Sequence, residues 1–169
     1  SDTLDWVTNA GFTRTAASQT VAVSDSMAGV YANSVNSVRY FFMLPYGLHD
    51  PAVSTELLGE RTLRGEPYHE IRVTFAVEGG GDDHDDVYHY FFHRDSGELD
   101  YLAYSFTVNG GGVRFREAIN QRRVNGLLVQ DYINYKPKAD APVADLAELL
   151  ETGGLKELSR IENTDVTFR

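Results

Sequence analysis

Residues 87–108, VYHYFFHRDSGELDYLAYSFTV, decide the fold of this chain. Two runs rich in aromatic residues flank Asp95-Ser96-Gly97, a pattern typical of two strands joined by a short loop. Glycine stands where a three-residue hairpin loop needs a left-handed residue. The stretch therefore predicts an antiparallel hairpin with strands over Val87–Arg94 and Glu98–Val108.

More strands are expected on both sides of this hairpin. In Tyr68–Val77 the odd positions are largely apolar and the even ones are mostly polar, which indicates a half-buried strand. Gly110-Gly111-Gly112 turns the chain into a strand over Val113–Arg122. Asn125-Gly126 is a strong hairpin turn into Leu127–Tyr135. The centre of the chain therefore reads as a meander of four or five antiparallel strands.

The flanking segments add smaller elements. The expected ones are a hairpin of Leu4–Thr8 with Gly11–Thr15, a strand at Gln19–Val23, a helix from Ser24 or Ser26 to about Phe42, a short helix at Val143–Glu151, and a mixed helix-then-strand tail from Leu155 to Phe168. The predicted fold class is mainly β (α+β), a curved antiparallel sheet with one or two helices packed against it. At 169 residues the chain is expected to form a single domain.

Both faces of the predicted sheet are apolar at its middle. We expect Phe75 to face Val87, which brings Val73 to His89 and His69 to His93. The opposite face then carries Tyr88, Tyr90, Phe92, Leu102, Tyr104 and Phe106. Because an antiparallel sheet usually leaves one face to water, the second apolar face needs a curled sheet, a partner or a ligand to cover it.

Composition excludes several classes of function. The 15 basic and 25 acidic residues give a net charge of -10, which argues against binding to nucleic acid or to an anionic membrane surface. The absence of cysteine excludes disulfides, thiolate zinc sites and cysteine nucleophiles. The longest apolar stretch, Val38 to Leu48, is interrupted by Pro45 and is too short to span a bilayer.

Residues 82–86, DDHDD, are the most visible candidate for a metal site. Asp83, His84 and Asp86 are ligand types that a divalent cation accepts, although the spacing does not match a helix-loop-helix calcium loop. The plainer interpretation is a solvated acidic turn. His69 and His93 could form half of a metal site in the expected register, or they are ordinary hydrogen-bonding histidines.

Two other groups could bind a ligand. The aromatic side chains Tyr88, Tyr90, Phe92, Tyr104 and Phe106 either form an apolar ligand surface or pack in the core. Arg114 and Arg116 either hold a carboxylate or phosphate head group or pair with surplus acids on a solvated face. The sequence lacks G-x-S-x-G, and neither triple glycine precedes Lys-Ser/Thr, so nothing indicates a serine hydrolase or a phosphate loop.

Several motifs resemble an uncharacterised family of exported proteins from Gram-negative bacteria, a domain of unknown function. They are Asn9-x-Gly11-Phe12, Leu44-Pro45-Tyr46-Gly47-Leu48-x-Asp50-Pro51, Gly110-Gly111-Gly112-x-Arg114-Phe115-Arg116-Glu117 and Asp131-Tyr132-x-Asn134-Tyr135-Lys136-Pro137. The resemblance implies a fold similar to LolA-like lipoprotein carriers, in which a half-barrel sheet wraps helices around an apolar concavity. It also implies a periplasmic or outer-membrane-associated protein whose relatives carry further N-terminal strands. Without those strands, Leu4–Thr15 would leave an open edge that invites homodimerisation.

Three functions remain in competition. The leading hypothesis is non-enzymatic binding of an apolar or lipid-like ligand, with no cofactor and no catalytic residue. The second is a structural or protein-interaction domain whose spare face is closed by another protein. The third is a metal-dependent hydrolase that uses the Asp83/His84/Asp86 loop.

Overall fold

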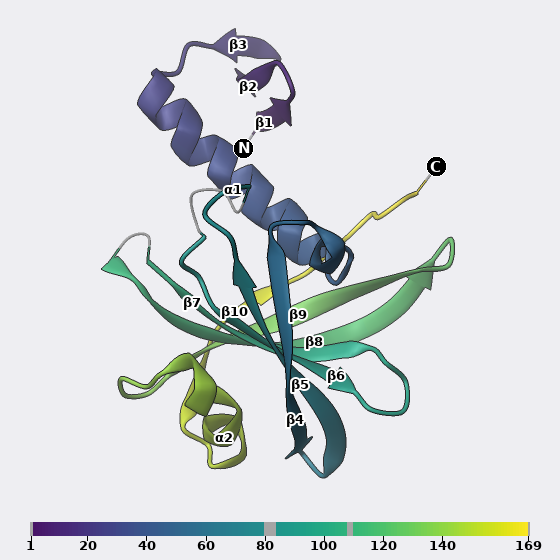
Figure 1. Ribbon diagram of the computed structural model, residues 1–169. Helices are drawn as coiled ribbons and strands as arrows, with labels where there is room; N and C mark the ends of the chain where they lie inside the picture. Colours follow the sequence, from purple (N-terminus) through teal and green to yellow (C-terminus); the bar gives the residue numbers. More distant parts are fainter. Residues whose placement is uncertain (1, 80–83, 108–109, 169) are drawn as a thin grey trace. The chain divides into compact units, whose positions relative to one another are not determined.

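The computed structural model describes residues 2–79, 84–107 and 110–168 of the chain. The chain separates into two compact units, Ser1–Leu44 and Pro45–Arg169 (Figure 1). Each unit has its own sheet and its own helix, so each is described by itself.

Unit 1 is a small three-stranded antiparallel sheet followed by a helix. Its elements are β1 (Thr3–Thr8), β2 (Gly11–Ala16), β3 (Gln19–Val21) and α1 (Asp25–Met43). Ser24 caps α1, because its hydroxyl accepts a hydrogen bond from the Met27 backbone N–H at 3.4 Å. Arg14 joins sheet and helix, since it pairs with Asp5 at 2.7 Å and lies 3.5 Å from the centre of the Tyr31 ring. The predicted hairpin, third strand and helix are confirmed.

Unit 2 is a seven-stranded antiparallel sheet with short helical segments. Its elements are η1 (Tyr46–His49), β4 (Val53–Leu63), β5 (Glu66–Phe75), β6 (Tyr88–His93), β7 (Leu99–Phe106), β8 (Gly112–Val124), β9 (Leu127–Pro137), η3 (Val143–Asp145), α2 (Leu146–Glu151) and β10 (Leu155–Ile161). The strand order β10-β9-β8-β7-β6-β5-β4 makes the whole sheet one meander. The predicted meander is therefore confirmed and longer than expected. The tail differs from the prediction, because Leu155–Ile161 is a strand that pairs with β9 and residues 155–168 contain no helix.

Tight turns explain why neighbouring strands pair in chain order. Arg64 and Gly65 both have positive φ, 49° and 87°, between β4 and β5. Asn125 and Gly126 do the same between β8 and β9, with φ of 48° and 84°. Two successive left-handed residues give the turn whose twist matches that of paired strands, and asparagine and glycine adopt it at low cost.

One face of the large sheet packs against η3 and α2. This α2 face carries Phe91, Tyr101 and Phe115, whose rings lie 5.8–6.1 Å apart around Phe115. Leu63, Leu146 and Ala147 are buried in the same cluster. Apolar burial of this kind is the main stabilising term in a small domain.

The sheet bends over its α2 face. Arg64, in the turn after β4, forms an ion pair with Glu117 on β8. In a flat sheet these two strands would lie about 19 Å apart, because neighbouring strands are separated by about 4.8 Å. The contact therefore requires curvature. The sheet stays open in the part of the chain that the structure describes, with β4 and β10 at its edges.

The opposite face, here called the aromatic face, carries Tyr88, Tyr90, Phe92, Tyr104 and Phe106. The six side chains predicted to share a face do so, since Tyr88 pairs with Tyr104 and Tyr90 with Leu102. The predicted pairing with β5 is wrong by one residue. Val73 faces Tyr88, and Ile71 faces Tyr90, so both lie on the aromatic face. The register shift adds two apolar side chains to this face.

The observed fold is the predicted class, mainly antiparallel β with a curved sheet and two α-helices. Among the described residues, neither helix has the length and apolar character that crossing a bilayer requires.

Candidate functional site

The aromatic side chains of β6 and β7 form one continuous row. Successive ring centres are 6.4 Å apart from Phe92 to Tyr90, 5.7 Å from Tyr90 to Tyr88, 5.3 Å from Tyr88 to Tyr104 and 6.2 Å from Tyr104 to Phe106. The Tyr88 and Tyr104 rings are stacked, because the two residues are direct partners across the strands. The alternation of side chains along each strand aligns the row with the strand direction.

The middle of the row is more buried than its ends. Tyr90 is fully buried, and Tyr88 and Tyr104 are also buried. Phe92 and Phe106 at the ends are half-buried. The ends are therefore the accessible parts of this surface.

Two arginines of β8 continue the row on the same face. Arg116 is buried, donates a hydrogen bond to the Tyr104 hydroxyl at 3.2 Å, and lies 5.8 Å from the Tyr132 ring centre. Arg114 lies 4.8 Å from the centre of the Phe106 ring and faces Tyr104 across the strands. A cation over a ring face is attracted by the electrons of the ring. The aromatic row thus ends in a positive charge.

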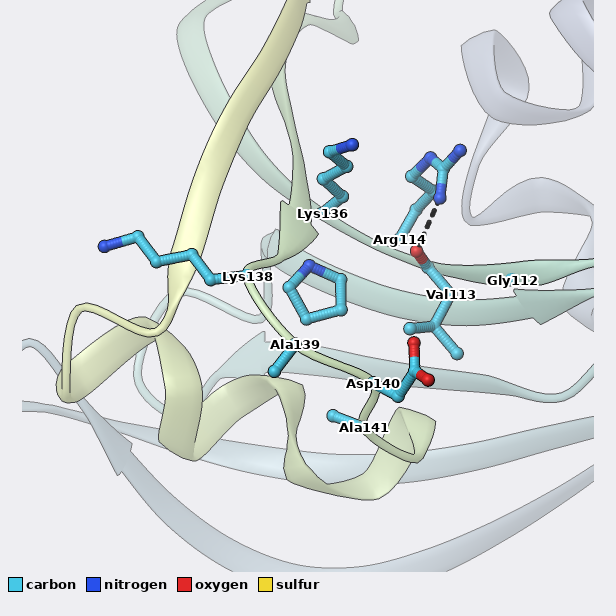
Figure 2. Close-up of a pocket in the computed structure, with 9 residues that line it drawn as sticks. Gly112, Val113, Arg114, Lys136, Lys138, Ala139, Asp140 and Ala141 are labelled. Carbon is cyan, nitrogen blue, oxygen red and sulfur yellow. Dashed lines mark hydrogen bonds between the residues drawn. The ribbon is translucent and has the colours of Figure 1, made fainter.

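Arg114 also lines a cavity of about 510 Å³ between the ends of β8 and β9 (Figure 2). The Arg114 guanidinium donates to the Val113 carbonyl at 2.8 Å, which holds the side chain over the cavity. The cavity is lined by Gly112, Val113, Arg114, Lys136, Pro137, Lys138, Ala139, Asp140 and Ala141. Figure 2 shows the charged ends of Arg114 and Lys136 extending in the same direction, whereas Lys138 extends away from both.

The buried acids of the α2 face have partners within the fold. Glu70 accepts from Arg61 at 2.7 Å and from His89, whose Nδ1 is 2.7 Å away. Glu117 pairs with Arg64 and accepts from the Tyr135 hydroxyl at 2.8 Å. Burial raises the pKa of Tyr135, and its hydrogen bond to Glu117 raises it further. Each of these carboxylates is occupied by a structural contact.

Asp131 belongs to the same set of held carboxylates. Burial alone would raise its pKa. Hydrogen bonds from the Asn163 backbone, from Asn120 and from Arg122 outweigh burial, so the pKa of Asp131 lies below its usual range. The charged form of Asp131 therefore stabilises the folded chain.

The predicted metal loop lies only partly within the described residues. Asp83 lies outside the described residues. His84 is half-buried with its Nε2 3.5 Å from Asp85, and Asp86 is buried. Across residues 2–79, 84–107 and 110–168, no group of three or more histidine and acidic side chains is arranged to hold a metal ion.

The predicted pairing of His69 with His93 is wrong. His93 faces Tyr68, and His69 faces Phe92, so the two imidazoles lie on opposite faces of the sheet. The Tyr68 and His93 rings contact each other at 5.3 Å. His93 accepts hydrogen bonds from the backbone of Asp95 and Ser96, so it fixes a turn.

The structure brings together all seven residues that the sequence suggested for ligand binding. Five form the aromatic row, and Arg114 and Arg116 lie at its side on β8. Sequence reasoning missed Lys136, whose place beside Arg114 depends on the pairing of β8 with β9. The signal that could have found it is the charge pattern of Tyr135-Lys136-Pro137-Lys138, which contains two of the chain's three lysines.

Comparison with known proteins gives a family and no function. No curated protein and no solved structure matches the chain significantly. One family model matches residues 5–163, which is nearly the whole chain and includes the aromatic row and the cavity. The chain belongs to DUF6503, a family of unknown function.

Proposed function

We propose that this protein binds an apolar or lipid-like small molecule on the aromatic face of its large sheet, without catalysing a reaction. The observation that carries the proposal is the unbroken row of five rings that ends at Arg114. Ligand sites are typically apolar surfaces with a small number of placed polar groups. The compartment that we propose for this activity is the cell envelope.

Binding fits this face better than catalysis. The charged groups beside the row are arginines, which stay protonated and therefore orient an anionic group without transferring a proton. Glu70, Glu117 and His89, which could transfer protons, lie on the α2 face and are held in structural contacts, whereas His69 faces Phe92 on the aromatic face.

A ligand would meet the row at its half-buried ends, Phe92 and Phe106. Because Tyr90 is fully buried, a ligand that extends along the row displaces protein groups that cover it. Each methylene group removed from water contributes about 0.8 kcal/mol, so a long acyl chain offsets the cost of this displacement.

Native mass spectrometry of the protein purified from its natural host tests the proposal, followed by solvent extraction of whatever is bound. We expect adducts of lipid mass that are lost on denaturation. A titration with a fluorescent fatty acid measures the affinity directly. A bare polypeptide mass combined with no saturable binding of the probe would overturn the proposal.

A pair of variants locates the site. Phe106→Ala removes one end of the row and should weaken binding of the fluorescent fatty acid about tenfold, a typical loss for one aromatic contact. Tyr46→Ala is the matched control, because Tyr46 is an exposed aromatic residue of η1, outside the row. Equal affinities of the two variants would place the ligand elsewhere.

A further inference from the structure

The lysines of this chain gather at one place. The sequence has only three, Lys136, Lys138 and Lys156, and they lie at the end of β9, just after it and on β10. Elsewhere the ion pairs to acids are made by arginines or histidines. In the described part of the chain, no ion pair involves Arg114 or any of the three lysines. A protein with a net charge of -10 therefore keeps a cationic patch whose members form no ion pair within the described residues.

The sheet register places three of these cations side by side. Lys136 faces Lys156 directly across β9 and β10. On the other side of β9, Phe115 faces Tyr135 and Arg116 faces Asn134, and continuing this register brings Arg114 beside Lys136. Direct partners in an antiparallel sheet point to the same face, and like charges there destabilise the pairing. A bound anion would remove this repulsion.

The cavity gives such an anion room beside two of the three cations, Arg114 and Lys136, while Lys156 lies outside its lining. Arg114 and Lys136 line it, and Figure 2 shows their charged ends extending in the same direction. Lys138 also lines it, but its Nζ donates to the Gly153 carbonyl at 2.7 Å, which turns the amine elsewhere. Asp140 contributes one negative charge to the lining. The three aligned cations together with Asp140 carry a net charge of about +2.

We propose that Arg114, Lys136 and Lys156 bind a phosphate group. A phosphate monoester carries a charge of about -1.5 to -2 at neutral pH, which matches the cluster, whereas a carboxylate would neutralise only half of it. The guanidinium can donate two parallel hydrogen bonds to phosphate oxygens, and the lysines act as point charges around them.

The phosphate site extends the proposed function. It rests on that function in one respect, which is that the phosphate belongs to a lipid. Arg114 lies over Phe106, so the site adjoins the end of the aromatic row. A lipid with a phosphate head group would reach both surfaces at once. Inorganic phosphate shares the head-group chemistry but lacks the tail, so the two sources can be separated by experiment.

The test compares three probes by calorimetric titration of the full chain: lysophosphatidic acid, a monoacylglycerol with the same acyl chain, and inorganic phosphate. We expect lysophosphatidic acid to bind at least about tenfold more tightly than the uncharged lipid, because charge-assisted hydrogen bonds to phosphate are strong. The difference should shrink as salt is added, since exposed charges are screened. Equal affinity for both lipids would overturn the phosphate site and leave the proposed function standing.

Charge-removing variants assign the residues. Lys136→Gln combined with Lys156→Gln should abolish the preference for lysophosphatidic acid over the monoacylglycerol. Lys138→Gln is the matched control, because Lys138 lines the same cavity but is turned toward Gly153, and it should keep the preference. Full preference in the double variant would contradict the assignment.

Inorganic phosphate separates the two proposals. If neither lipid binds, but inorganic phosphate binds and the double variant abolishes that binding, the phosphate site is supported and lipid binding is refuted. Phosphate binding that the double variant retains would refute the site.

Discussion

The two faces of the large sheet differ in whether their charged side chains form ion pairs. On the α2 face, the buried carboxylates Glu70, Glu117 and Asp131 each meet an arginine that the same fold supplies. Along the aromatic face and the cavity next to it, Arg114, Lys136 and Lys156 form no ion pair within the described residues, and Asp140 also lines the cavity. The acids of one face are paired within the fold, whereas the cations of the other are those that we propose bind a molecule from outside.

The same contrast holds for the apolar residues. The α2 face closes on its own helical segments, with Leu63, Phe115 and Leu146 fully buried in one cluster. The aromatic row is half-buried at Phe92 and Phe106. We therefore expect the α2 face to dominate stability and the ends of the aromatic face to contribute mainly to binding.

The largest expected effect is the loss of the core ring on the α2 face. Phe115→Ala should lower the free energy of unfolding by about 3–5 kcal/mol, because it leaves a cavity among fully buried side chains. Phe106→Ala, at a half-buried position, should cost about 1 kcal/mol. Urea denaturation followed by circular dichroism measures both, since the single tryptophan, Trp6, lies in unit 1. Equal losses of unfolding free energy in the two variants would show that Phe106 belongs to a second core.

A smaller effect should come from the paired acids. Asp131→Asn should lower the free energy of unfolding at pH 7 by about 1–2 kcal/mol, because it weakens the contacts with Arg122 and Asn120. The pKa of Asp131 is lowered in the fold, so its contribution is fully present above the unfolded value of about 3.9 and is lost as the pH falls through the folded value.

The pH profile therefore distinguishes charge from packing at Asp131. The stability difference between the wild-type chain and Asp131→Asn should be constant above about pH 5 and should shrink below about pH 4. A difference that persists unchanged in acid would show that the carboxylate acts only through its shape and its neutral hydrogen bonds.

The sequence was sufficient for the meander and insufficient for its register. Local turn signals such as Asn125-Gly126 specify which strands are neighbours. The register of β5 against β6 depends on a connection of about a dozen residues, 76–87, which is too long to set it. Strand β6 is largely apolar on both faces, so its pattern does not reveal which of its faces the apolar side of β5 joins.

The cationic patch of Arg114, Lys136 and Lys156 could not be predicted from the sequence for a related reason. Lys136 and Lys156 lie far apart in the chain and become neighbours only because Leu155–Ile161 pairs with β9. The sequence of that segment predicts a mixed tail, and its pairing depends on the edge that the rest of the sheet leaves open. The aromatic row was accessible from the sequence because its members lie on one hairpin, where alternation alone assigns the face.

The smallest expected effect tests whether the cations repel each other as the register implies. Lys156→Gln removes the charge opposite Lys136 and should raise the free energy of unfolding of the ligand-free chain by about 0.3 kcal/mol at low ionic strength. In about 1 M salt, where the screening length falls to about 3 Å, the gain should disappear. Lys138→Gln should show no such gain, because Lys138 donates to the Gly153 carbonyl instead of facing another cation. If Lys156→Gln is more stable but binds phosphate less well, the repulsion between the lysines lowers stability and the same charges serve binding. If Lys156→Gln is less stable, the lysine stabilises β10 and the aligned charges do not lower the stability of the fold.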